Sequence, residues 1–295
     1  MPNQFESVIR AAGPVIDPES ARLLYEGMHA GGAGAVERDL AYGADPRHRL
    51  DVFSPAAPVA GGTPVVVFLH GGGFIRGDKA HRAEVGHYFA RNGVLAILPN
   101  YRLGPAHGWP AGAQDVGAVF EWARANAARF GGDPRRIVLG GESAGAAHVA
   151  AAVLIRRFHP EGGLAASGAM LVSGVYNAEL ELKARRQLGI ATPDPRNEAY
   201  FGIGFDQYRC MSTVDLVDAA PVPMLISYAE LDPIQMQVQA GELFARLVTR
   251  HGFEPDIQVV RGHNHLTQVY SINTDDDGLA ASLLAFIRTC GPTEQ

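Results

Sequence analysis

Short apolar runs alternate with helical patterns along most of the chain, and this alternation restricts the possible folds more than any other feature. Seven runs are strand-sized and rich in β-branched residues, namely Arg49–Phe53, Val65–Leu69, Val94–Leu98, Ile137–Gly140, Ala169–Val172, Met224–Tyr228 and Ile257–Val260. Most of them lack polar alternation, as expected for strands that are buried on both faces of a parallel sheet. The pattern predicts an α/β fold with a mostly parallel central sheet of about eight strands flanked by helices.

The helical patterns between these runs have recognisable ends. Ala111–Phe130 stops at a Gly-Gly-Asp-Pro segment, and Ile234–Arg250 stops near a glycine that can adopt a left-handed C-cap. The last predicted helix, Gly278–Thr289, follows the acidic run 275–277. We interpret this run as capping and dipole compensation rather than as a metal site.

Two stretches depart from the alternation. The N-terminal segment contains one predicted helix, Pro18–Ala30, capped by Asp17, and the other stretch is polar, aromatic and interrupted by proline. We predict that these stretches, approximately 1–34 and 175–220, form a small helical cap over the sheet edge where ligands bind in open α/β sheets. Because 295 residues with 47% hydrophobic composition can bury one large core, residues 1–295 are expected to form a single domain.

The segment Ile137–His148 has the pattern of a strand, a G-x-S-x-G turn and a helix. Such a turn presents a serine as a nucleophile at the edge of the sheet. Gly141 and Gly145 suit this turn, because a Cβ atom would clash where the strand and the helix approach closely. Ser143 is therefore the predicted nucleophile of a serine hydrolase, and the alternative is a structural serine in a tight turn.

A glycine-rich loop, His70-Gly71-Gly72-Gly73-Phe74, directly follows the second apolar run. Attack on an acyl carbonyl places negative charge on its oxygen, and backbone N–H groups free of side chains can converge on that charge. We predict that Gly72 and Gly73 donate to this oxyanion together with Ala144, the residue after the nucleophile. His70 is interpreted as a structural residue that holds the loop in place.

The acid and the base of such a site should follow the serine in that order. Asp232 comes just after a predicted strand and starts the next helix with a proline, so it is preferred to Glu230. His265 is preferred to His263 as the base, because it lies farther along its loop. The predicted triad of Ser143, Asp232 and His265 would act through an acyl-enzyme. No cofactor is expected, and no metal either, because no further Cys/His cluster accompanies the His-x-His pair.

The walls of a substrate pocket are marked less clearly. Apolar and aromatic residues near the predicted site can line an acyl or alcohol pocket or can simply pack the cap. The predicted substrate-binding residues are Phe74, Ile75, Tyr101, His148 and Phe205. A small cap and a short chain predict short acyl groups.

Charge and hydropathy exclude several classes of partner. The net charge of −6 offers no basic surplus for phosphate neutralisation, so nucleic acid is not an expected partner. The first residues lack a cationic and apolar leader, and no apolar run approaches the roughly 20 residues that span a bilayer. We expect a cytoplasmic protein that meets a small acyl ester and water, with a homo-oligomer left open.

Further motifs accompany the serine turn and the glycine-rich loop. They are Asn100-Tyr101-Arg102-Leu103, Pro110–Asp115, Phe130–Pro134 and Asp232-Pro233. With them the chain resembles bacterial α/β-hydrolase esterases of the hormone-sensitive-lipase-like group, including those akin to kynurenine formamidase. The resemblance implies the α/β-hydrolase fold, a small helical cap and hydrolysis of carboxylic esters. An aryl formamidase or amidase is the alternative. An inactive ligand receptor on the same fold is disfavoured, because serine, acid and histidine are all present.

Overall fold

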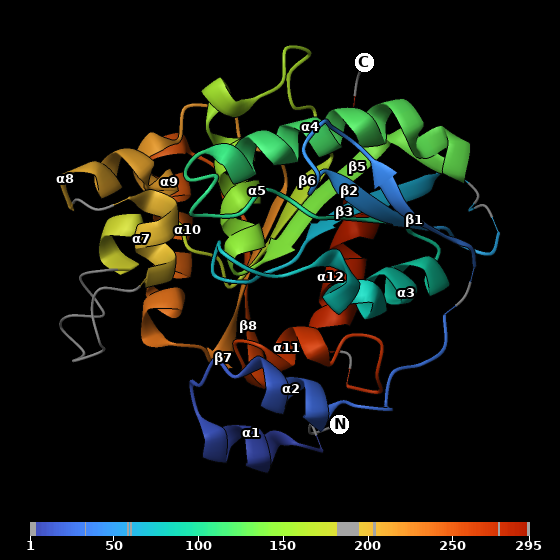
Figure 1. Ribbon diagram of the computed structural model, residues 1–295, viewed down its shortest axis with the longest axis horizontal. Helices are drawn as coiled ribbons and strands as arrows, with labels where there is room; N and C mark the ends of the chain where they lie inside the picture. Colours follow the sequence, from blue (N-terminus) through green and yellow to red (C-terminus); the bar gives the residue numbers. More distant parts are fainter. Residues whose placement is uncertain are drawn as a thin grey trace.

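The computed structural model describes residues 4–32, 34–57, 59, 61–181, 195–202, 205–276 and 278–293. Within these ranges the strands form one eight-stranded sheet in the order β1-β2-β4-β3-β5-β6-β7-β8 (Figure 1). β2 pairs antiparallel with β1 and with β4, and the other neighbours are parallel. The strands are β1 Val36–Ala41, β2 Arg49–Phe53, β3 Thr63–Leu69, β4 Leu95–Pro99, β5 Gly132–Glu142, β6 Gly168–Val172, β7 Met224–Leu231 and β8 Asp256–Asn264. The predicted α/β class and mostly parallel sheet are confirmed.

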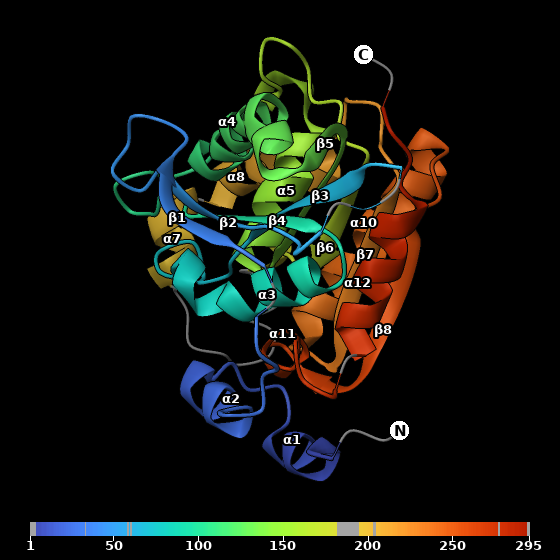
Figure 2. The same ribbon diagram turned by 90° about the vertical axis from the view of Figure 1, so that its right-hand side faces the viewer.

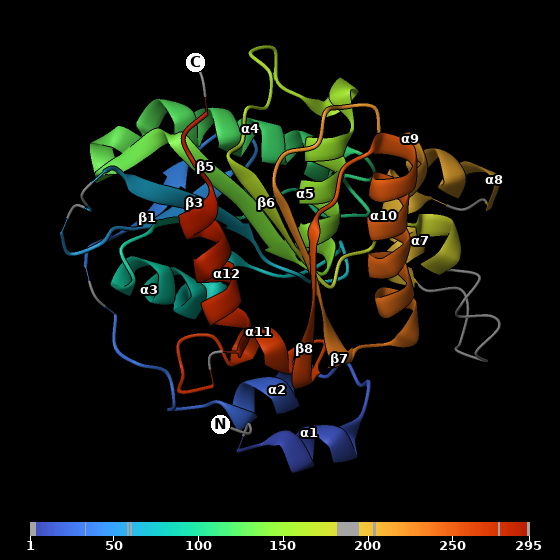
Figure 3. The same ribbon diagram turned by 180° about the vertical axis from the view of Figure 1, so that it is seen from behind.

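Helices cover both faces of the sheet (Figures 2 and 3). One face is covered by α4 (Ala111–Asn126), α5 (Ala144–Leu154) and α10 (Ile234–His251), and the other by α3 (Ala83–Arg91) and α12 (Gly278–Thr289).

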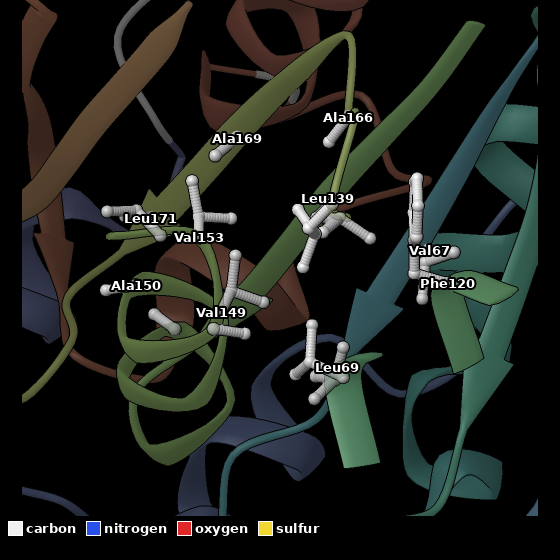
Figure 4. Close-up of a cluster of buried hydrophobic side chains, with 14 of the residues drawn as sticks. Val67, Leu69, Phe120, Leu139, Val149, Ala150, Val153, Ala166, Ala169 and Leu171 are labelled. Atoms are coloured by element: carbon white, nitrogen blue, oxygen red, sulfur yellow. The ribbon is translucent and has the colours of Figure 1, made fainter. Parts of the chain in front are cut away.

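Strand β3 shows why the sequence lacks polar alternation. Its residues alternate between the two cores, with Val65, Val67 and Leu69 in one and Val66 and Phe68 in the other. Figure 4 shows the first core, where Leu69, Leu139 and Leu171 of three strands lie close to the valines of α5. Both faces of the central strands are therefore apolar.

The remaining helices lie near the carboxyl ends of the strands or beside α10. They are α1 (Glu6–Ala12), α2 (Pro18–Leu24), α7 (Pro195–Phe201), α8 (Phe205–Tyr208), α9 (Thr213–Leu216) and α11 (Thr267–Tyr270). α1 contacts β8 and α2 contacts α11, at the lower edge of the molecule in Figure 1. Over the described ranges, no helix is both long enough and apolar enough to cross a membrane.

The prediction of one N-terminal helix over Pro18–Ala30 was wrong. Within this range α2 covers only Pro18–Leu24, and a second helix that was not predicted, α1, precedes it at Glu6–Ala12. Asp17 does cap α2, accepting the N–H groups of Glu19 at 3.1 Å and Ser20 at 3.3 Å. α2 ends at Leu24 because the next residue, Tyr25, is fully buried against the rest of the protein and donates its hydroxyl to Asp276. Tertiary contacts therefore end the helix earlier than the local pattern predicts.

Strand β1 was not predicted. It is an edge strand with mostly exposed residues, and its pairing with β2 is interrupted by a register shift after Glu37. An exposed edge strand needs no apolar run, so it leaves little hydrophobic pattern in the sequence.

Candidate active site

The turn between β5 and α5 holds Ser143 in a strained backbone conformation. Ser143 has φ 50° and ψ −118°, which non-glycine residues rarely adopt. A Cβ atom on Gly141 would lie 2.6 Å from the carbonyl carbon of Gly145, and one on Gly145 would lie 2.7 Å from the His70 carbonyl oxygen. The two glycines therefore allow strand and helix to approach closely enough to form this turn.

Asp232 and His265 lie just beyond the ends of the neighbouring strands β7 and β8. They are 2% and 3% exposed, and Nδ1 of His265 donates to Oδ1 of Asp232 at 2.6 Å. The second oxygen, Oδ2, accepts the Ala229 N–H at 2.7 Å and the Ser173 hydroxyl at 2.6 Å. Burial lowers the pKa of His265, but the charge and hydrogen bond of Asp232 outweigh burial and raise it above its ordinary value.

The rival acid and the rival base have other partners. Glu230 accepts the Gly262 N–H at 2.9 Å and pairs with Arg10 of α1 at 3.0 Å. His263 lies 3.3 Å from Thr267 through Nδ1 and 3.3 Å from Asp276 through Nε2. The structure thus brings His265 to Asp232 rather than to Glu230.

The contact between His263 and Asp276 shows what one residue of the acidic run 275–277 does. Asp276 interacts with His263 and accepts the Tyr25 hydroxyl at 3.0 Å. Residue 277 lies outside the described part of the chain, so capping of α12 stays an interpretation. No group of three or more Cys, His, Asp or Glu side chains suited to a metal ion occurs among the residues described.

The glycine-rich loop after β3 lies beside Ser143. Gly72 has φ 144° and Gly73 has φ 59°, so both adopt conformations that favour glycine. A Cβ atom on Gly72 would overlap the Arg76 carbonyl oxygen, and one on Gly73 would lie 2.8 Å from Cδ of Arg196. Ala144 is the first residue of α5, where backbone N–H groups lack partners within the helix.

His70 holds the start of this loop. Its Nδ1 is 2.7 Å from the Gly71 carbonyl oxygen, and its ring stacks on Tyr101, whose hydroxyl donates to the His70 carbonyl at 2.8 Å. Burial lowers the pKa of His70 to about 4, so the ring is neutral at pH 7. Nδ1 therefore carries the proton that it donates to Gly71.

The ion pair of Glu142 and Arg82 was not predicted from the sequence. Oε1 of Glu142 accepts the Gly71 N–H at 2.9 Å and also accepts from Nε of Arg82, whose guanidinium lies over the Tyr270 ring at 4.6 Å. Burial raises the pKa of Glu142, but the Arg82 charge and both hydrogen bonds outweigh burial and lower it. The position of Glu142 inside the serine turn was a sequence signal, whereas Arg82 carried none.

A cavity of about 300 Å³ opens onto these residues. Ser143, His265, Gly72 and Gly73 line it, together with residues from both stretches predicted as cap, from the glycine-rich loop and from the segments that follow β7 and β8. These include Ile16, Pro18, Phe74, Val175, Glu181, Arg196, Asn197, Met236, Leu266 and Tyr270. The fold thus collects the predicted nucleophile, base and loop glycines around one space.

Among the four predicted pocket residues whose side chains the structure describes, one, Phe74, lines the cavity. Tyr101 and His148 do not, because they are buried beneath the glycine-rich loop, where His148 packs edge-to-face on Phe74 at 5.5 Å. Burial lowers the pKa of His148 to about 3. Ile75 is half-buried and is also not a lining residue, and the side chain of Phe205 lies outside the described structure. Aromatic character alone did not distinguish cavity walls from packing.

Comparison with known proteins gives the same fold. A family model described as the alpha/beta hydrolase fold matches residues 66–269. An inhibited esterase B from Lactobacillus rhamnosis superposes with a TM-score of 0.77 at 17% identity, covering 96% of this chain and 94% of that one. A hyperthermophilic esterase from the archaeon Pyrobaculum calidifontis superposes with a TM-score of 0.74 at 21% identity, covering 97% of each chain. At these identities the likeness shows the fold alone.

Curated relatives match over shorter stretches. A probable isoprenylcysteine alpha-carbonyl methylesterase of Oryza sativa subsp. japonica is 38% identical over 128 residues, which are 43% of this chain and 30% of that protein. The carboxylesterase NlhH of Mycobacterium tuberculosis is 42% identical over 83 residues, which are 28% of this chain and 26% of that protein. The chain therefore matches less than a third of the length of either relative.

Proposed function

Because the chain belongs to the alpha/beta hydrolase fold family, we propose that it is a serine hydrolase that cleaves small carboxylic esters. One fold hosts many chemistries, so the proposal rests on the site. The observation that carries it is the buried 2.6 Å contact between His265 and Asp232, beside a cavity that Ser143 also lines. The names of the relatives, methylesterase and carboxylesterase, favour an ester over a formamide as substrate.

In the proposed mechanism Ser143 attacks the acyl carbon while His265 takes its proton. Asp232 keeps the His265 proton on Nδ1, which leaves Nε2 as the base. The imidazolium then returns the proton to the departing alkoxide, and an acyl-enzyme remains. A water molecule attacks this acyl group with His265 again as the base, which releases the acid and restores the serine.

Negative charge on the carbonyl oxygen is stabilised by the backbone N–H groups of Gly72, Gly73 and Ala144. The positive φ values of the two glycines support this role, because a side chain at either position would meet neighbouring atoms. Loss of one such donor typically lowers the rate by about 10²–10³-fold. The hydrogen bond from the Gly71 N–H to Glu142 helps to hold the loop in place, because Gly71 directly precedes the two glycines.

The two stretches 1–34 and 175–220 are proposed to act as the cap of a single domain. Support comes from Ile16 and Pro18 of the first stretch and from Val175 and Arg196 of the second, which line the cavity. A volume of about 300 Å³ lies at the lower end of the range for ligand pockets. It therefore favours short acyl groups.

Hydrolysis of p-nitrophenyl esters by the purified protein tests the proposal. We expect turnover of the acetate, a lower kcat/KM as the acyl chain lengthens to palmitate, and slower cleavage of N-formylkynurenine. Ser143→Ala should abolish hydrolysis, whereas Ser282→Ala, at a half-buried position on α12, should leave it unchanged. Unaltered activity in Ser143→Ala would overturn the assignment of this site, and a rate that rises through palmitate would overturn the short-acyl preference.

A further inference from the structure

We propose that Ser173 and Gln268 are positioning residues that set the basicity of His265 through a closed chain of hydrogen bonds. The chain runs from the His265 carbonyl through Gln268, Ser173 and Asp232 back to the His265 ring. This inference rests on the proposed function, because it concerns the acid and base assigned there. It adds two residues that no sequence motif marks.

Ser173 directly follows β6 and is fully buried. Its hydroxyl donates to Oδ2 of Asp232 at 2.6 Å, next to the Ala229 N–H at 2.7 Å, while Oδ1 serves the His265 ring. Three donors thus hold the carboxylate. Among the described residues, the Ser173 hydroxyl is the only side-chain donor to Oδ2.

Gln268 determines that the Ser173 hydroxyl is the donor in its hydrogen bond with Asp232. Nε2 of Gln268 donates to the Ser173 hydroxyl oxygen at 2.7 Å and to the His265 carbonyl at 3.1 Å. A carbonyl oxygen only accepts, so the amide must present its NH₂ group to this side. Because the Ser173 oxygen accepts from Gln268, the hydroxyl proton is left to point at Asp232.

Both residues carry a cost that structural packing does not explain. Ser173 has φ +48°, a left-handed conformation that glycine would adopt without strain. The Oε1 atom of Gln268 is buried and has no hydrogen-bond partner among the residues that the structure describes. Such costs persist where the surrounding structure requires the side chain. The requirement here is the contact with Asp232.

The contact has a defined consequence for His265. The Ser173 hydroxyl partly neutralises the buried Asp232 carboxylate, which reduces what the carboxylate gains from a charged imidazolium beside it. Without the hydroxyl, the imidazolium form becomes more favourable and the pKa of His265 rises. This change does not alter the other charged or titratable groups nearby. They are Glu142 and Glu181, whose charges also raise the pKa of His265, and Tyr176, whose pKa the Asp232 charge raises.

The test uses Ser173→Ala and Ser173→Gly in the full chain. Both remove the hydroxyl, but only the glycine also relieves the positive φ. The readouts are the acid limb of kcat/KM against pH and an NMR titration of the His265 ring, assigned with His265→Gln. We expect both variants to move the His265 pKa upward by about 0.5–1 unit, in line with the loss of one hydrogen bond of typical net strength. Gln268→Leu should move it in the same direction by a smaller amount.

Ser227→Ala is the matched control. Ser227 lies on the adjacent strand β7, is fully buried, and accepts the Ser173 N–H through its carbonyl at 2.8 Å, but its hydroxyl has no partner within the described part of the chain. We expect no shift of the His265 pKa in this variant. An unchanged or lowered pKa in folded Ser173→Ala and Ser173→Gly would overturn the inference, as would an equal rise in Ser227→Ala. If wild type does not hydrolyse esters, the proposed function fails instead, and the NMR titration still decides the role of Ser173.

Discussion

Replacing Glu142 by glutamine tests the buried ion pair with Arg82. The Glu142 and Arg82 side chains are 3% and 9% exposed, and glutamine keeps the shape of Glu142 and an acceptor for the Gly71 N–H. The change leaves the Arg82 cation without its anion. Breaking one side of a buried pair typically costs about 3–5 kcal/mol. Because the Tyr270 ring 4.6 Å away still stabilises the guanidinium, we expect the lower end, about 3 kcal/mol of unfolding free energy.

A double-mutant cycle separates this effect from packing. Arg82→Met removes the cation but retains most of the apolar volume, and it leaves Glu142 uncompensated in turn. In the double variant neither charge remains, so its loss should be smaller than the sum of the single losses by at least about 1 kcal/mol. Urea unfolding of the four proteins measures this, provided that the denaturant slopes agree. Losses that simply add would refute the pairing.

The same pair gives a pH dependence of stability with a definite sign. Burial raises the pKa of Glu142, but Arg82 and the two hydrogen bonds lower it below its ordinary value of 4.5. Between the folded pKa and 4.5 the unfolded chain binds more protons than the folded one, so stability falls as the pH falls through this window. Glu142→Gln should lack this part of the acid destabilisation.

Three further predictions follow from single contacts. Because Asp232 raises the pKa of His265, kcat/KM should fall as the pH drops through a value above 6.5, and an acid limb below 6.5 would contradict this. Gly145→Ala places a Cβ atom 2.7 Å from the His70 carbonyl and should lower the free energy of unfolding by about 3 kcal/mol or more, whereas Gly241→Ala in α10, with open space around it, should raise it by about 0.5–1 kcal/mol. Urea unfolding distinguishes them, and equal effects would show that the elbow tolerates a side chain. Tyr25→Phe removes the hydroxyl bonded to Asp276 and should cost about 1–2 kcal/mol in the same assay, so an unchanged midpoint would show that this hydrogen bond does not stabilise the fold.

The buried strands and the last helix could be predicted because their signals are local. β2 covers Arg49–Phe53 and α12 covers Gly278–Thr289, the ranges expected from the apolar runs and the flanking residues. The early end of α2 could not be predicted, because the cause is the burial of Tyr25 against a segment near Asp276, 251 residues away.

The residues of the proposed site also fall into those that local sequence signals predict and those that only tertiary packing brings together. Motif order selected Ser143, Asp232 and His265, since each comes within a few residues of an apolar run and directly follows the strand that contains this run. The pair of Arg82 and Glu142 joins residues 60 positions apart, and that of Ser173 and Asp232 joins residues 59 apart. Their proximity depends on the tertiary packing, including the adjacency of β6 and β7, which no single segment encodes.

The ends of β7 and β8 each carry two polar residues, two positions apart, with different partners. Asp232 and His265 contact each other. Glu230 and His263 instead hold the N-terminal segment: Glu230 pairs with Arg10, and His263 contacts Asp276, which accepts the Tyr25 hydroxyl. That segment supplies Ile16 and Pro18 to the cavity wall. The same two strand ends therefore orient the proposed base and anchor part of the proposed cap. We expect that a change which breaks the Glu230–Arg10 or the His263–Asp276 contact alters both the shape of the cavity and the geometry of the base.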